Sequence, residues 1–179
     1  MKTLCNGDTF TQNGETFRVN FEHDADAGYP QDNCDGHGKV RRSNYAHTES
    51  RSDKKPGERP LNNPGRNEYQ FYYDWADACK QAKKDGWNTP QYDAPNRVER
   101  AVKADFEFLR GFLNNDWEYV GVIVSRLDSN GEETGETESL CGVETFRDYH
   151  NCVALELAQS IIDYGKSRES IAEQFYVGM

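Results

Sequence analysis

The stretch "TFTQNGETFRVNFEH", residues 9–23, predicts the start of an antiparallel sheet. Its Asn13-Gly14 pair lies between two short runs rich in Thr, Phe and Val, and Asn-Gly is the dipeptide that a tight hairpin turn favours. After the turn, Phe17, Val19 and Phe21 alternate with polar residues. One face of the second strand is therefore apolar, and we expect it to pack on a hydrophobic core.

Two helices are predicted in the middle of the chain. Aromatic side chains alternate over residues 69–73, as in a half-buried strand, and Asp74 can then cap a helix that ends before Gly86. A longer apolar stripe at helical spacing covers residues 98–112 and contains one polar residue, Asp105. We expect this second helix to be the longest buried one.

The last third of the chain predicts another hairpin and a helical end. The Val-Ile-Val run at residues 122–124 is typical of a central strand, which returns through Asn130-Gly131 to a partner near residues 139–144. Amphipathic helical spacing follows from residue 147. The order of elements indicates an α+β fold, a mostly antiparallel sheet with helices packed on it, in a single domain of residues 1–179.

Residues 22–66 interrupt this pattern. They contain no periodic apolar spacing and are rich in Pro, Gly, Asn, Ser and charge, so we expect one long polar loop. Loops longer than about 12 to 15 residues are uncommon in compact domains and are often functional.

Composition limits the class of protein. The chain of 179 residues has a net charge of −10, with 35% apolar and 12% aromatic residues, and the aromatic side chains supply area for a core. No apolar run approaches the roughly 20 residues that span a bilayer, and the N-terminus has no stretch of signal-peptide length. We therefore expect a cytoplasmic protein outside the membrane. Its five cysteines form no CxxC pair, which favours free thiols.

The segment "HDADAGYPQDNCDGHGKV", residues 23–40, raises the question of a divalent metal site. Its aspartates partly match the oxygen-ligand spacing of a calcium loop, and Cys34 with His37 has the spacing of a zinc-ligand pair. A solvated loop with Asx turns explains the same residues, and both interpretations stay open. The candidate metal ligands are His23, Asp24, Asp26, Asp35 and His37.

The same segment could support catalysis. His23 with Asp24, or His37 with Asp35, could act as a general base and its partner. No nucleophile elbow, phosphate-binding loop, kinase or zincin motif occurs, so the sequence assigns no catalytic residue. A metal-dependent hydrolase or nuclease-like enzyme that uses the His23–His37 loop is the alternative to a binding protein.

Charge is unevenly distributed. Residues 39–66 contain eight Lys or Arg against three acids, which could contact nucleic acid or be a solvated charge run. Residues 103–179 contain six basic residues against fifteen acids, and their carboxylates could form a face that resembles a phosphate array. Such acids also serve simply to keep a protein soluble. The candidate binding residues are Glu132, Glu133, Glu136, Glu138 and Glu144.

Three segments together resemble a group of small acidic proteins encoded by tailed bacteriophages. They are "EHDADAGYPQDNCDGHGKV", "FYYDWADACKQAKKDGWNTP" and "NDWEYVGVIVSRLDSNGEETGETESLCGVE". The chain departs from that pattern at Lys39, where we expect Pro, and at Cys141, where we expect a large aromatic residue. The resemblance implies an accessory protein of the host cytoplasm that binds, and in some cases blocks, a host protein such as a defence or nucleic-acid enzyme; it implies no catalytic residue.

Overall fold

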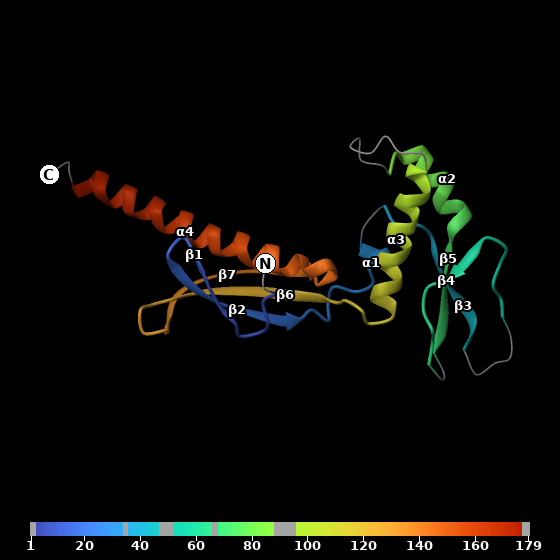
Figure 1. The fold of residues 1–179 in the computed structure, drawn as a ribbon, viewed down its shortest axis with the longest axis horizontal. Coiled ribbons are helices and arrows are strands. Elements are labelled where there is room, and N and C mark those ends of the chain that lie inside the picture. Colours follow the sequence, from blue (N-terminus) through green and yellow to red (C-terminus); the bar gives the residue numbers. More distant parts are fainter. Residues whose placement is uncertain (1–2, 34–35, 47–51, 66–67, 88–95, 177–179) are drawn as a thin grey trace. The chain divides into compact units, whose positions relative to one another are not determined.

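The computed structural model describes residues 3–33, 36–46, 52–65, 68–87 and 96–176, the last eight of these by their backbone alone. The chain divides into two compact units, Met1–Ala27 with Glu118–Met179 as unit 1, and Gly28–Trp117 as unit 2. The sequence predicted a single domain, whereas each unit here has its own sheet and its own core. Both sheets are antiparallel and packed with helices, which confirms the α+β class (Figure 1).

Unit 1 contains a four-stranded antiparallel sheet in the order β1-β2-β6-β7. The predicted hairpin is confirmed, because Asn13 and Gly14 both have positive φ, 52° and 86°, and Phe10 lies opposite Phe17. The later hairpin is confirmed as well, and Ile123 lies opposite Ser139. The strands are β1 (Thr9–Gln12), β2 (Glu15–His23), β6 (Tyr119–Leu127) and β7 (Glu133–Glu144).

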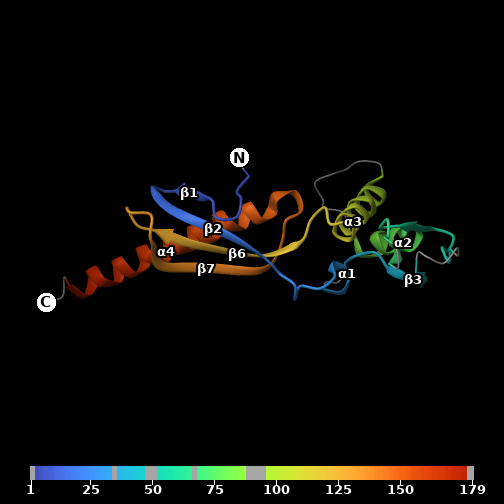
Figure 2. The same ribbon diagram turned by 90° about the horizontal axis from the view of Figure 1, so that it is seen from below.

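One long helix covers a face of this sheet. After the short 3₁₀ turn η1 (Phe146–Asp148), α4 (Tyr149–Tyr176) runs along β6 and β7 (Figure 2). Its apolar stripe packs against the inward side chains of β2 and β6, so both surfaces leave water together. The core consists of Phe17, Val19, Val120, Val122, Val124, Val143, Val153, Ala154, Ala158, Ile161 and Ile162.

The described residues of unit 2 form a three-stranded antiparallel sheet in the order β3-β5-β4 and three helices. The predicted cap of the second of these helices is confirmed, because Asp74 accepts the N–H of Asp77 at 3.0 Å and Gly86 ends the helix at φ 68°. The core is Leu61, Tyr73, Ala78, Ala82, Val102 and Leu109. The elements are α1 (Pro30–Asn33), β3 (Val40–Ala46), β4 (Glu58–Pro60), β5 (Tyr69–Asp74), α2 (Trp75–Asp85) and α3 (Arg97–Leu113).

The expectation of one polar loop over residues 22–66 was wrong, because α1, β3 and β4 all lie within it. The strands escaped detection because they are not built on alternating aliphatic residues. Arg41 and Arg42 of β3 instead lie over the rings of Tyr72 and Tyr69, at 4.9 and 4.5 Å from the ring centroids. In such a contact the guanidinium itself lies over the aromatic ring, and because arginine counts as polar, hydropathy gives no signal.

Replacing Leu109 with Ala should lower the free energy of unfolding by about 2 to 5 kcal/mol. Leu109 has no exposed surface and lies in the core of unit 2, so the substitution leaves a cavity. Chemical denaturation measures the change, and Lys103→Ala, on the exposed side of α3, is the control with an expected change under about 0.5 kcal/mol. Equal effects of the two substitutions would contradict the assigned facing of α3.

Candidate functional site

The five predicted metal ligands are divided between the two units. His23, Asp24 and Asp26 belong to unit 1 and His37 to unit 2, while Asp35 lies outside the described residues. The Nδ1 atom of His23 lies 2.6 Å from a carboxylate oxygen of Glu118, and both side chains are largely exposed.

Asp24 has a structural role that the metal hypothesis did not foresee. Its two carboxylate oxygens accept the backbone N–H groups of Asp26 at 3.2 Å and of Gly142 at 2.8 Å, which joins the end of β2 to the bulged end of β7. Within the described part of the chain, no group of three or more His, Cys, Asp or Glu side chains is placed to hold a metal ion. These residues therefore give no support to the predicted divalent-metal site.

His37 takes part in a different cluster, built around the carboxylate of Asp105. The Nδ1 atom of His37 lies 2.5 Å from one carboxylate oxygen. The other oxygen accepts the O–H of Tyr73 at 2.6 Å and the backbone N–H of Gly38 at 2.8 Å. The imidazole also stacks on Phe108, with ring centroids 5.5 Å apart, so its orientation is fixed on two sides.

Local sequence explains why this cluster forms. A Cβ atom at position 38 would overlap the ring of Tyr73, so glycine is required for the backbone to approach Asp105. Burial raises the pKa of Tyr73, and the hydrogen bond to Asp105 raises it further, so the phenol keeps its proton and donates it. The sequence did carry one signal of this cluster, since Asp105 is the one polar residue of an apolar stripe. A buried carboxylate requires hydrogen-bond donors, so its position indicates that other polar groups lie beside it.

The cluster has the geometry of a base and its orienting group. The sequence paired His37 with Asp35, whereas the structure pairs it with Asp105, 68 residues along the chain. A carboxylate at Nδ1 fixes the imidazole so that Nε2 can accept a proton or bind an electrophile. Among the described residues, no hydroxyl or thiol is hydrogen-bonded to His37, so no nucleophile completes a catalytic arrangement there.

Replacing Asp105 with Ala should destabilise unit 2 by roughly 2 to 5 kcal/mol, because it leaves the Tyr73 O–H and the Gly38 N–H without an acceptor. Tyr73→Phe removes one of these donors and keeps the ring, so it should cost only about 0.5 to 1.5 kcal/mol. Thermal or chemical unfolding measures both variants. A larger loss for Tyr73→Phe than for Asp105→Ala would contradict the central position of the carboxylate.

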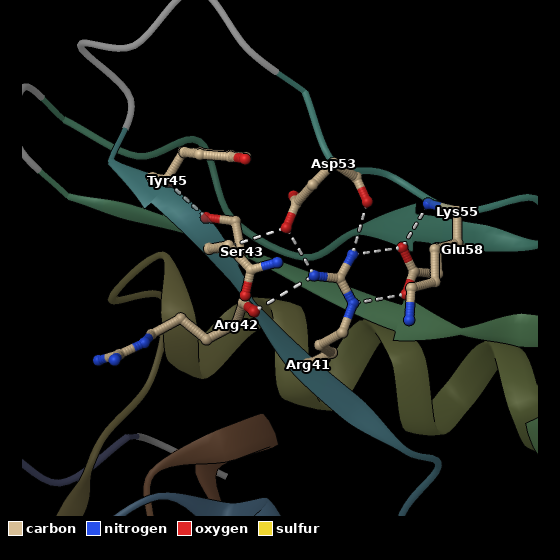
Figure 3. Close-up of polar contacts among 8 residues, drawn as sticks. Arg41, Arg42, Ser43, Tyr45, Asp53, Lys55 and Glu58 are labelled. Atoms are coloured by element: carbon tan, nitrogen blue, oxygen red, sulfur yellow. Dashed lines mark hydrogen bonds and ion pairs between the residues drawn. The ribbon is translucent and has the colours of Figure 1, made fainter.

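The predicted basic segment is held by an ion-pair network around Arg41 (Figure 3). The guanidinium donates two parallel bonds of 2.8 Å to the carboxylate of Glu58, one of 2.9 Å to the carboxylate of Asp53 and one of 3.0 Å to the backbone oxygen of Asp53. The side chains of Arg41, Glu58 and Asp53 are only 23%, 6% and 14% exposed. This network holds the segment that precedes β4 against β3.

The same network changes the acidity of its carboxyls. Hydrogen bonds from Arg41 lower the pKa of Glu58, and the backbone N–H of Asn44, together with Arg41, lowers the pKa of Asp53. Both groups therefore stay ionised well into the acid range. Because Arg41 is neutralised within the fold, it is not free to bind a phosphate.

Other described cations of the segment are exposed. The guanidinium of Arg59 lies 3.3 Å from the ring centroid of Trp75, and Lys39, Lys54 and Lys55 are exposed. Unit 2 as a whole is nearly neutral, with fifteen Lys or Arg against fourteen Asp or Glu in its sequence. Nucleic-acid binding here would depend on a few exposed lysines and arginines, without long-range attraction.

Replacing Arg41 with Met should destabilise the protein more at neutral pH than in acid. The pKa values of Glu58 and Asp53 are lower in the folded state than in the unfolded state. Their contribution to the free energy of unfolding is therefore fully present above the unfolded pKa values of about 4.3 and 3.9, and it is lost as the pH falls through the folded pKa values. The difference in unfolding free energy between wild type and variant should therefore be largest above about pH 5 and shrink below it.

Denaturant titrations between neutral pH and about pH 3 measure this difference. Arg42→Met is the matched control, since Arg42 lies over Tyr69 and pairs with no carboxylate among the described residues. A pH-independent effect of Arg41→Met would contradict the network.

The predicted acidic binding residues gather on one strand. Glu133, Glu136, Glu138 and Glu144 lie on β7 and Glu132 directly precedes it. Glu133 forms an ion pair with Arg18 at 3.2 Å, and Glu136 forms one with Arg126 at 2.9 Å.

The acidic strand keeps an excess of negative charge despite these pairs. Arg126 also binds Glu15 at 2.9 Å, so one cation serves two carboxylates. Glu138 is exposed and has no ion-pair partner among the described side chains.

A hollow of about 470 Å³ lies at the adjoining end of the sheet and is lined by Glu15, Asp128, Glu136 and Arg126, among others. Backbone N–H groups of Glu132 and Asn130 lower the pKa of Asp128, which therefore keeps its negative charge. Three carboxylates against one guanidinium give this hollow a negative balance.

The two units differ in net charge. Unit 1 contains six Lys or Arg and seventeen Asp or Glu, a net charge of −11, whereas the corresponding value for unit 2 is +1. The negative charge of the protein therefore belongs to the unit that carries β7.

Comparison with known proteins gives no match, since no family model, no curated protein and no solved structure is significantly similar to the chain. In the described residues, no helix has the length and apolar character needed to cross a membrane.

Proposed function

We propose that this chain is a phage-type accessory protein that binds a host protein through the acidic surface of unit 1 centred on β7. The observation that supports the proposal is the concentration of charge, −11 on unit 1 against +1 on unit 2. A defence enzyme or a nucleic-acid enzyme of the host cytoplasm is the expected partner, because such enzymes present basic clefts to a polyanion.

Inhibition follows from this mode of binding when the basic cleft is the DNA site itself. Carboxylates along a strand offer several negative charges at short intervals, as a phosphate backbone does. The bound protein and the DNA would then compete for the same cations. Attraction of this kind is screened over about 8 Å at physiological ionic strength, so binding should depend steeply on salt.

An enzyme is the second candidate, and the fixed pair of His37 and Asp105 is the observation that favours it. The activity would be a metal-dependent, nuclease-like hydrolysis in which His37 acts as a base or as a metal ligand. An assay of phosphodiester and nucleotide hydrolysis with added Mg²⁺, Mn²⁺ or Zn²⁺ tests this candidate. Turnover by the wild type that is lost in His37→Gln would favour an enzyme over the binding protein.

Capture of proteins from a nuclease-treated bacterial lysate tests the binding proposal. The wild type should retain a DNA-binding protein whose binding weakens with salt and is displaced by added DNA. Replacing Glu132 and Glu138 with Gln should weaken this binding by about tenfold or more, through loss of two charges that no described basic side chain pairs with. Glu22→Gln with Glu156→Gln removes the same charge from β2 and α4 and is the matched control.

Equal binding by the two double variants would contradict a role for β7. Capture of no specific protein, or capture that ignores salt and DNA, would contradict the proposed function.

A further inference from the structure

β7 forms an edge of the unit 1 sheet. It is twelve residues long and, within the described residues, pairs with β6 alone. Most strands have about five or six residues, and a long edge strand presents a row of backbone N–H and C=O groups that another strand can pair with. Most of β7 is exposed.

Two hydrogen bonds show which amides of β7 point outward. The N–H of Asp24 donates to the oxygen of Tyr119 at 3.0 Å, and the N–H of Thr145 donates to the oxygen of Glu118 at 2.9 Å. Odd-numbered residues of β6 therefore bond toward β2 and even-numbered ones toward β7, because the pattern alternates along a strand.

Ser139 and Thr137 lie opposite the odd-numbered residues Ile123 and Ser125. They form the non-hydrogen-bonded pairs of this ladder, so their own N–H and C=O groups point away from the sheet. Glu138 and Leu140 lie opposite Val124 and Val122 and bond inward. The free edge is thus centred on Thr137 and Ser139.

The side chains around this edge favour a basic partner. Glu138 shares the face of its cross-strand neighbour Val124, and Glu136 reaches Arg126, which lies beside Gly165 of α4, so both acids lie on the α4 side of the sheet. A strand added at the edge would place every second side chain next to these carboxylates.

We propose that the outer edge of β7 receives an extended basic segment of the partner as a fifth strand. Its backbone bonds to Thr137 and Ser139, and Lys or Arg at alternate positions faces Glu136, Glu138 and the negatively lined hollow beside Arg126. This inference rests on the proposed function and specifies how the acidic strand binds.

A second copy of the chain fits this edge poorly. Antiparallel pairing of two β7 strands about Glu138 sets that residue opposite itself, and pairing about Thr137 sets Glu138 opposite Glu136. Like charges directly opposite one another destabilise a sheet. In these two registers the acids oppose self-association of the edge, and they favour a cationic strand for the same reason.

The test uses the full-length protein and a synthetic peptide of about ten residues in which Lys alternates with Thr. Binding should slow hydrogen exchange at the amides of Thr137 and Ser139 in NMR spectra, and the effect should weaken with salt. Ser139→Pro keeps every charge and removes one outward N–H, so it should lower peptide affinity by about tenfold or more. Ser139→Ala keeps the N–H and should bind as the wild type does.

Each alternative result has a separate meaning. Peptide binding without protection of the two amides, or equal binding by Ser139→Pro, would overturn strand addition while leaving electrostatic binding of a host protein intact. No peptide binding to the wild type would also overturn it. Failure of the lysate capture, by contrast, would remove the proposed function itself. The exchange measurement on the wild type keeps the test decisive if Ser139→Pro folds poorly.

Discussion

Strand β6 is the constraint on which unit 1 depends. Seven of its nine residues are buried, it pairs with β2 on one side and β7 on the other, and its core face lies under α4. Within the described residues, β7 is therefore an edge strand of the sheet. A strand in that position keeps one edge near water, where exposed glutamates are tolerated. The packing that forms the fold thus also creates the acidic edge.

Unit 2 depends more on polar contacts. Asp105 joins His37, Gly38 and Tyr73 to α3, while Arg41 joins Glu58 and Asp53 to β3. Each buried charge has several partners, which is the condition for a buried ion to be tolerated. These contacts engage His37 and Arg41, two of the charged residues that sequence alone presented as candidates for metal or phosphate binding.

The sequence predicted those elements whose signals are local. The Asn13-Gly14 turn, the Asp74 cap and the apolar stripe before Leu113 are confirmed, because turn, cap and helix patterns lie within a few neighbouring residues. It missed β3 and β4, whose arginines lie on aromatic rings. The pair of His37 with Asp105 and the neutralisation of Glu133 by Arg18 also depend on residues far apart in the chain, which no local pattern reports.

The central claim is that β7 presents a free backbone edge among negative charges, and residue-resolved hydrogen exchange of the protein alone tests it most directly. The account predicts alternation, with fast exchange at the amides of Thr137 and Ser139 and slow exchange at those of Glu138 and Leu140. Slow exchange at all four amides, or the opposite alternation, would contradict the claim, because the edge would then be covered or the register different.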